Sequence, residues 1–144
     1  MQNEPLRILL VEDDEIDVRH FRRSMRQEQV PCEITVAGNG LEALDHMRGT
    51  GGRERLDDPY IVVLDINMPR MNGHDLLTEV RKDPSLSRTV VFMMTTSQDA
   101  NDIALAYNAH VAGYVVKGTT PGDGASIAGF LQTYWSSVML PVAA

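Results

Sequence analysis

Residues 60–73 read YIVVLDINMPRMNG, and an apolar run in this stretch ends abruptly at a carboxylate. The run, Ile61 to Leu64, is short, β-branched and free of polar alternation, which is typical of a strand buried on both faces of a parallel sheet. The proline and the Asn-Gly pair that follow predict a loop leading into a helix. Asp65 therefore stands at the carboxyl end of a central strand, the edge where open α/β sheets bind ligands.

Four further apolar runs alternate with segments of helical periodicity. The runs are Leu6–Val11, the region around Ile34 and Val36, Thr89–Met94 and Gly113–Val116. In the last helix, helical spacing predicts that the sheet is covered by Ile127, Phe130, Leu131, Tyr134 and Val138. Five strands alternating with five helices predict an α/β fold, doubly wound, in which right-handed crossovers cover both faces of a parallel sheet.

Length and composition indicate one domain of ordinary size. We expect a single domain over residues 1–144, with a core of about residues 6–138 and a tail of residues 139–144. The net charge of -7 disfavours nucleic acid and anionic membranes as partners. One cysteine cannot form an internal disulfide, and neither a leader nor a membrane-spanning stretch is recognisable, so we expect a cytoplasmic protein.

Polar residues stand where the predicted strands end. Strand one ends at Glu12 and Asp13, strand three at Asp65, strand four at Thr95 and strand five at Lys117. If strands one and three are neighbours, three carboxylates converge, and such a cluster stays ionised at neutral pH only beside a cation. Oxygen ligands with room for waters suit Mg²⁺ better than Ca²⁺ or Zn²⁺.

These residue types together predict a phosphoryl-transfer site. A carboxylate nucleophile, a divalent cation, an ammonium and a hydroxyl can hold the charge that develops on a transferred phosphoryl group, so Asp65 would become an aspartyl phosphate. The plainer interpretation is that each acid is a solvated loop residue. That interpretation is common for one aspartate but weaker for five suitable residues at the matching strand ends.

The motifs resemble the receiver domain of two-component response regulators. They are VEDD ending at Asp14, LDINMPRMNG from Leu64 to Gly73, MTT from Met94 to Thr96 and YVVK from Tyr114 to Lys117. The resemblance covers the chain from Leu6 to about Val138. It implies a flavodoxin-like sheet with strand order 2-1-3-4-5.

The resemblance also implies a role for each site residue. Asp65 is the phosphoacceptor for a histidine kinase, and Thr95 and Lys117 bind the phosphoryl group. Mg²⁺ is held by Asp13, Asp65 and the backbone carbonyl of Asn67, with Glu12 assisting through water. Tyr114 matches an aromatic switch whose ring moves inward together with Thr95, which carries the signal to the face formed by the fourth helix, fifth strand and fifth helix.

One position departs from the family pattern. Receivers usually have a proline after the lysine, joined by a cis bond, whereas this chain has Gly118. A cis bond before a residue other than proline costs about 2.5–4 kcal/mol, so we expect a trans bond and a differently shaped loop through Gly118, Thr119 and Thr120.

A narrower likeness is to the small stand-alone response regulators that partner bacterial phytochromes. It rests on the loop at residues 49–59, the RKDPSLSRTVVFMMTTS stretch, the missing proline and the YWSSVMLP tail. It implies a light-sensing phytochrome kinase as partner and a homodimer. Surplus apolar residues that fit a dimer interface are Trp135, Met139, Leu140 and Val142.

Two other functions are compatible with part of this pattern. A phosphohydrolase with a similar site has an acidic residue two positions after the nucleophile, where this chain has Asn67, so we expect no enzyme beyond self-phosphorylation and autodephosphorylation. The alternative that stays open is a degenerate receiver that binds proteins without being phosphorylated. Retention of the five strand-end residues argues against it.

Overall fold

The computed structural model describes residues 4–118 and 127–142, in which strands and helices alternate. The elements are β1 (Leu6–Val11), α1 (Glu15–Gln27), β2 (Cys32–Ala37), α2 (Gly40–Arg48), β3 (Ile61–Leu64), α3 (Gly73–Lys82), β4 (Val90–Thr95), α4 (Ala100–Asn108), β5 (Gly113–Val116) and α5 (Ile127–Ser137). No helix among these described residues is long and apolar enough to cross a membrane.

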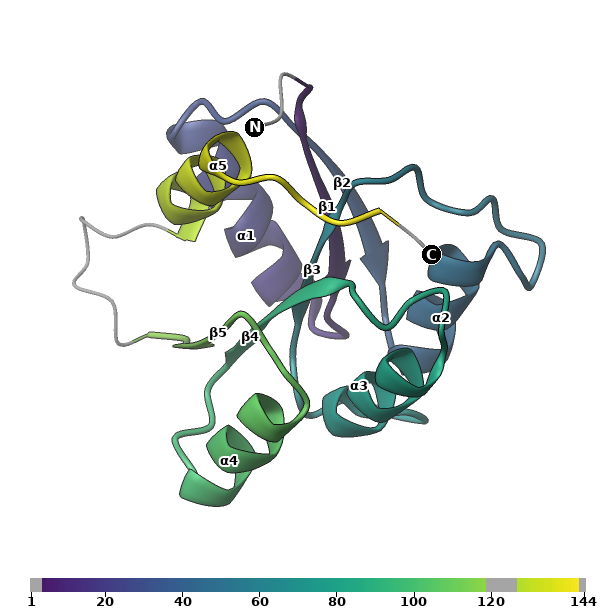
Figure 1. Ribbon diagram of the computed structural model, residues 1–144. Coiled ribbons are helices and arrows are strands. Elements are labelled where there is room, and N and C mark those ends of the chain that lie inside the picture. The colour runs from purple at the N-terminus through teal and green to yellow at the C-terminus, as the bar shows by residue number, and fades with distance from the viewer. Residues whose placement is uncertain (1–3, 119–126, 143–144) are drawn as a thin grey trace.

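The five strands form one parallel sheet in the order β2-β1-β3-β4-β5, as expected. Helices α1 and α5 lie on one face, and α2, α3 and α4 on the other (Figure 1). Strands β1 and β3 are neighbours, with Val11 opposite Leu64, so both deliver their following residues to one edge. This register brings the predicted acidic residues together.

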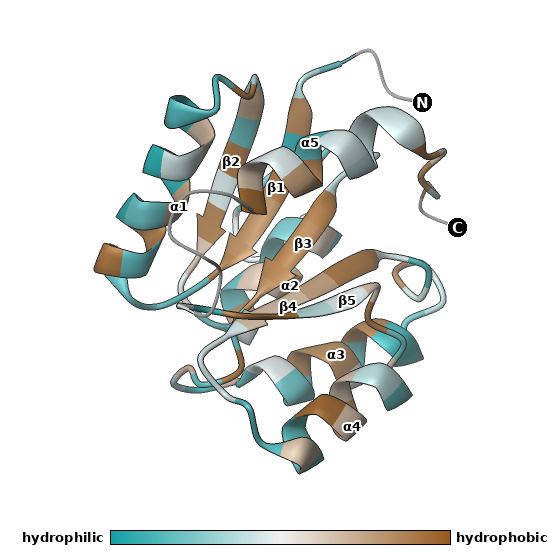
Figure 2. Cartoon of the chain, turned by 90° about the vertical axis from the view of Figure 1, so that its left-hand side faces the viewer, coloured by the Kyte–Doolittle hydropathy of each residue, from teal (hydrophilic) through white to brown (hydrophobic). Residues whose placement is uncertain are grey.

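The sheet separates two apolar layers, and its central strands are the most hydrophobic part of the chain (Figure 2). All four residues of β3 are buried, as its uninterrupted apolar run predicts. One layer contains Phe21 of α1, Phe92 of β4 and Trp135 of α5. The other contains Leu44 of α2 and Leu77 of α3.

The buried face of α5 matches the predicted one in part, since Leu131 is buried and the partly exposed Ile127 and Tyr134 pack against the core. Ala128, Leu131 and Trp135, at spacings of three and four residues, point into the core, whereas Phe130 is 49% exposed. Trp135 is 1% exposed, and its Nε1 donates a hydrogen bond of 2.9 Å to the carbonyl oxygen of Glu4. The assignment of Trp135 to an exposed dimer interface is therefore wrong, because the residue fills the core of its own domain.

Candidate functional site

Three carboxylates meet at the carboxyl edge of the sheet. Glu12 and Asp13 follow β1, Asp65 follows β3, and one oxygen of each lies within 4.8 Å of the others. The backbone N–H of Asp65 donates to the carbonyl oxygen of Val11 at 3.0 Å, which extends the β1–β3 pairing to the site itself. The expected convergence of these three acids is thus present.

The backbone behind Asp65 requires a glycine. Gly73 begins α3, and its N–H donates to the carbonyl oxygen of Ile66 at 2.8 Å. A Cβ at position 73 would collide with the backbone carbonyl oxygen of Asp65. The Asn-Gly pair in the sequence is therefore explained by close approach, since Asn72 caps the helix and Gly73 lets it lie against the strand end.

Glu12 is the most buried acid of the cluster, with 5% of its surface exposed. Burial raises its pKa from 4.5 to about 7, and the nearby charge of Asp65 adds to that rise. Hydrogen bonds from Lys117 and from the backbone N–H of Asp14 oppose it only in part. Glu12 therefore holds a proton more readily than an ordinary glutamate.

Lys117 brings a positive charge to the cluster. Its Nζ lies 2.5 Å from Oε1 of Glu12, 2.9 Å from Oδ2 of Asp17 and 3.6 Å from Oδ2 of Asp65. Burial lowers the pKa of this ammonium, but the hydrogen bonds to Glu12 and Asp17 and the charge of Asp65 outweigh burial, so the net shift is upward. Lys117 therefore stays positively charged at neutral pH.

Asp17 was not identified from the sequence. It lies in the first turn of α1, and it meets Lys117 across 100 residues of chain. The only sequence signal is its place three residues after the capping residue Asp14, which puts it at the end of α1 nearest the site. Its partner depends on how α1 lies against the sheet, which spacing alone does not show.

Thr95 is the last residue of β4 and is fully buried. Its carbonyl oxygen accepts a 2.7 Å hydrogen bond from the backbone N–H of Lys117, so the fourth and fifth strand ends are tied together. Its hydroxyl oxygen accepts from the N–H of Ser97 at 3.4 Å. The predicted hydroxyl and the predicted ammonium therefore lie at the same edge of the sheet.

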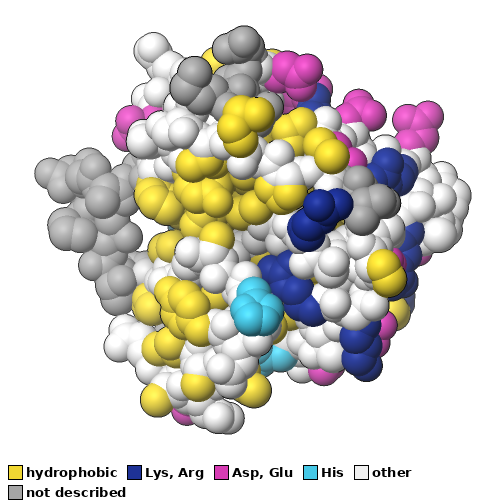
Figure 3. All heavy atoms as spheres, in the orientation of Figure 1, with side chains coloured by type: hydrophobic (Ala, Val, Ile, Leu, Met, Phe, Trp, Pro, Cys, Tyr) yellow, Lys and Arg dark blue, Asp and Glu magenta, His cyan; other side chains and the backbone are white. Residues whose placement is uncertain are grey.

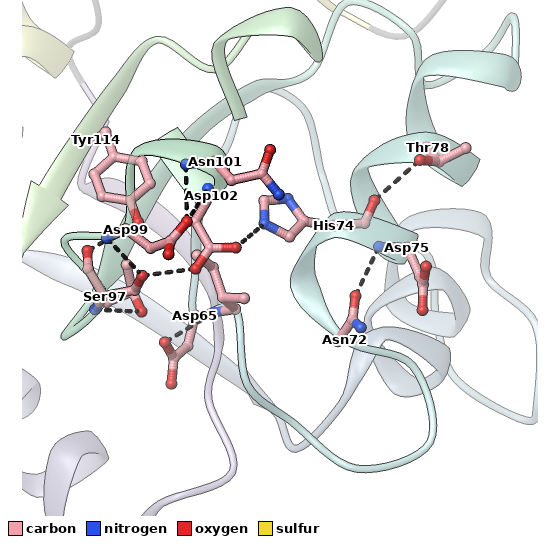
Figure 4. A network of polar contacts seen from close by, with 12 residues as sticks. Asp65, Asn72, His74, Asp75, Thr78, Ser97, Asp99, Asn101, Asp102 and Tyr114 are labelled. Carbon is pink, nitrogen blue, oxygen red and sulfur yellow. Dashed lines mark hydrogen bonds and ion pairs between the residues drawn. The ribbon is translucent and has the colours of Figure 1, made fainter. Parts of the chain in front are cut away.

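A chain of polar contacts joins Tyr114 to α3 (Figure 4). The Tyr114 hydroxyl donates to the carbonyl oxygen of Ser97 at 2.9 Å, and the Ser97 hydroxyl donates to Oδ2 of Asp102 at 2.6 Å. Asp102 then pairs through Oδ1 with Nε2 of His74 at 3.0 Å. The hydrogen bond from Ser97, aided by His74, lowers the pKa of Asp102. Sequence reasoning gave neither His74 nor Asp102 a role.

Two expectations concern loops beside the site. Asn67 is exposed in the loop between β3 and α3. The only cis peptide bond in the described part of the chain is Asp58–Pro59, so the expected trans bond between Lys117 and Gly118 is confirmed. Gly118 has a φ of 78°, a left-handed conformation that favours glycine. Thr119 and Thr120 lie outside the described residues.

The donor set fits a divalent cation. Glu12, Asp13 and Asp65 supply only carboxylate oxygens, which hard cations prefer over the nitrogen and sulfur ligands typical of zinc. Asp13 is exposed whereas Glu12 is buried, so the cluster has one side open to water. Such an arrangement leaves coordination positions for waters or for a phosphoryl oxygen.

Comparison with known proteins identifies relatives along nearly the whole chain. Response regulator Rcp1 of Synechocystis sp. is 30% identical over 142 residues, which cover 98% of this chain and 97% of that protein. The crystal structure of the phosphorylated cyanobacterial phytochrome response regulator RcpA aligns with a TM-score of 0.84 and 30% identity, covering 96% of this chain and 99% of that one. The Mn²⁺-bound form of Rcp1 aligns with a TM-score of 0.79 and 30% identity, covering 96% and 100%.

The family model of the response regulator receiver domain matches residues 8–127. That range contains most of β1, all of β2 to β5 and all five strand-end residues of the site. Two features of the structure agree with this match. The sheet has the order β2-β1-β3-β4-β5, and an acidic cluster faces a lysine. The chain belongs to the response regulator receiver domain family.

Proposed function

We propose that the chain is a response regulator whose Asp65 accepts a phosphoryl group from the phosphohistidine of a sensor kinase. The observation that carries this proposal is the position of Asp65 beside both the two acids that follow β1 and the ammonium of Lys117. A carboxylate there belongs to a candidate cation site and also lies close to a positively charged side chain. Both are required to neutralise an incoming phosphoryl group.

Each residue of the site has its own role in the phosphoryl transfer. A carboxylate oxygen of Asp65 attacks the phosphorus of the donor while the bond from phosphorus to the donor nitrogen breaks, and the imidazole leaves with the electron pair. Oδ1 of Asp65 is oriented by the N–H of Ile66 at 2.8 Å, and Oδ2 faces Lys117. Lys117 and the hydroxyl of Thr95 then bind phosphoryl oxygens.

Mg²⁺ is the cation that we propose for the acidic cluster. Glu12, Asp13 and Asp65 would hold it together with the backbone carbonyl of Asn67. When bound, it supplies charge neutralisation and a fixed orientation for the phosphoryl oxygens. The Mn²⁺-bound form of the relative Rcp1 supports a divalent cation in such a cluster.

Thr95 and Tyr114 would transmit the conformational change that phosphorylation of Asp65 causes. Thr95 moving toward the phosphoryl group alters the backbone from Thr95 to Ser97, and the carbonyl oxygen of Ser97 is the partner of the Tyr114 hydroxyl. We therefore propose that phosphorylation shifts the Tyr114 ring and reshapes the surface of α4, β5 and α5.

We propose a bacterial phytochrome as the cognate kinase. The relatives that support it are the cyanobacterial phytochrome response regulator RcpA and a response regulator in red light signaling of R. palustris, which is 27% identical with a TM-score of 0.75 and covers 95% of this chain and 99% of that one. Phosphotransfer from a purified phytochrome kinase, compared in red and far-red light, tests the assignment. Equal transfer from unrelated kinases would contradict it.

The test of phosphoacceptance is incubation with acetyl phosphate, with and without Mg²⁺, followed by intact-mass measurement. We expect a phosphate-sized gain that requires Mg²⁺ and is absent in Asp65→Asn. Asp75→Asn is the matched control, because Asp75 is an exposed acid in the first turn of α3, and it should be phosphorylated normally. No gain in the unaltered protein would favour the degenerate, phosphorylation-independent receiver.

A further inference from the structure

The ammonium of Lys117 is shared between two acids that differ in their exposure to water. The side chain of Glu12 is 4% exposed, whereas that of Asp17 is 36% exposed. Building on the proposed phosphoacceptor function, we propose that Asp17 is a positioning residue. It holds the Lys117 ammonium on the α1 side of the site and releases this ammonium when a phosphoryl group on Asp65 binds it.

Asp17 is well placed to hold a fixed position. It lies in the first turn of α1, and its backbone N–H donates to Oδ1 of the capping residue Asp14 at 3.3 Å. The cap orders this turn, so the Asp17 carboxylate projects from a defined helix start. Its Oδ2 lies 2.9 Å from Nζ of Lys117, within hydrogen-bond distance.

The lysine has a limited number of donors. Two of its three N–H groups are used by Glu12 and Asp17, and Asp65 lies at 3.6 Å, too far for a hydrogen bond. To donate fully to phosphoryl oxygens on Asp65, the ammonium has to move from the α1 side. That movement lengthens the contact of the ammonium with one of its two present partners, Glu12 or Asp17.

The exposure of the two acids to water determines which of them loses its contact with Lys117. Glu12 is buried, so water cannot readily replace the hydrogen bond that its carboxylate accepts from Lys117. Asp17 is one third exposed, so water can solvate its carboxylate when the lysine leaves. The Asp17 contact is therefore the replaceable one, and it stabilises the state without a phosphoryl group.

This competition has a measurable consequence. An interaction present only in the unphosphorylated state weakens the apparent affinity for anything that needs the other state. Removing the Asp17 charge should therefore strengthen binding of a phosphoryl mimic. A residue with a merely structural role would instead leave the affinity unchanged or lower it.

The experiment is a titration of the full chain with beryllofluoride in the presence of Mg²⁺, followed by calorimetry. We expect Asp17→Asn to bind the mimic about fivefold more tightly or better. Glu15→Gln is the matched control, because Glu15 is an exposed acid of the same helical turn that is not among the ion-pair partners of Lys117. It removes one negative charge near the site and should change affinity by less than about twofold.

A double-mutant cycle shows whether the effect passes through the lysine. In a Lys117→Gln background, Asp17→Asn should cause no further change in affinity for the mimic. Asp17→Glu keeps the carboxylate and should return the affinity toward that of the unaltered protein. Denaturant unfolding confirms that each variant is folded.

The outcomes separate this inference from the proposed function. Equal changes in Asp17→Asn and Glu15→Gln would mean a general charge effect and would overturn the inference. So would an Asp17→Asn protein that binds as the unaltered protein does or more weakly, even though Asp65 is phosphorylated normally. Failure of the unaltered protein to bind beryllofluoride or to be phosphorylated would overturn both.

Discussion

We expect protonation of Glu12 to compete with cation binding at the site. Glu12 is buried beside Asp65, and its pKa is raised to about 7 chiefly by that burial. The folded protein therefore takes up a proton on Glu12 as the pH falls through about 7, well above the 4.5 of an ordinary glutamate. A cation and this proton compete for the same carboxylate.

We expect Mg²⁺ affinity to fall as the pH falls below 7. For a single competing proton, the apparent Kd rises about tenfold per pH unit below the pKa. Calorimetric titration with Mg²⁺ at several pH values from 8 to 6 measures this slope, and Glu12→Gln should flatten it. A flat profile in the unaltered protein would show that Glu12 does not gate cation binding.

The strand-end residues of the site could be predicted, whereas Asp17 and Trp135 could not be placed. Parallel strands end at one edge, so Asp65 and Lys117 follow from the order of the elements. The Asp17 contact depends on the position of α1 over the sheet. Trp135 was misplaced because a mostly apolar helix has two faces of similar hydropathy, and only packing selects the one that enters the core.

Arg81 is the residue through which α3 holds its neighbouring turns. Its Nε donates to the carbonyl oxygen of Ala109 at 2.7 Å, and Nη2 donates to that of His110 at 3.1 Å. Nη1 donates to the carbonyl oxygens of Ser87 and Thr89, both at 2.8 Å. One side chain thus satisfies four carbonyls in the turns before β4 and before β5.

Replacing this side chain should destabilise the domain. We expect Arg81→Met to lower the free energy of unfolding by about 2–4 kcal/mol, because several carbonyls lose a charged donor at once. Urea unfolding measures the change. Arg88→Met is the control, since Arg88 is exposed, and it should change stability by less than about 0.5 kcal/mol. Equal losses in the two variants would contradict a special role for Arg81.

The helices and strands could be predicted from the apolar and capping patterns, whereas the side-chain contacts between them could not. The apolar run before Asp65 gave β3 with the predicted bounds, and the acid after β1 caps α1. Helix α4 begins at Ala100, because Asp99 is its cap and accepts from the N–H groups of Asn101 and Asp102. A long side chain such as Arg81 can reach several turns, and periodicity carries no information about its reach.

On the scale of the whole molecule, apolar side chains remain exposed on one surface. Figure 3 shows hydrophobic side chains gathered over α5 and the segment after it. Phe130 is 49% exposed, Met139 81% and Val142 59%, whereas Leu140 packs partly against the core. With Trp135 excluded by its burial, we propose that Met139, Leu140 and Val142, joined by Phe130, form a homodimer interface.

The dimer proposal is tested by placing a charge on this surface. We expect Met139→Glu to raise the Kd for dimerisation at least about tenfold, since an apolar side chain removed from water contributes about 1.5–3 kcal/mol. Analytical ultracentrifugation over a concentration series measures it. Leu41→Glu is the control, because Leu41 is 46% exposed on α2, which lies on the other face of the sheet. A monomeric unaltered protein, or an equal effect of the control, would refute this interface.

The contact between Lys117 and Glu12 spans 105 residues and joins the first strand to the last. During synthesis the acids of β1 and β3 emerge long before the lysine, so an incomplete chain carries a nest of negative charge without its counterion. The ion pair between Glu12 and Lys117 can therefore form only after the chain has been synthesised and folded through β5.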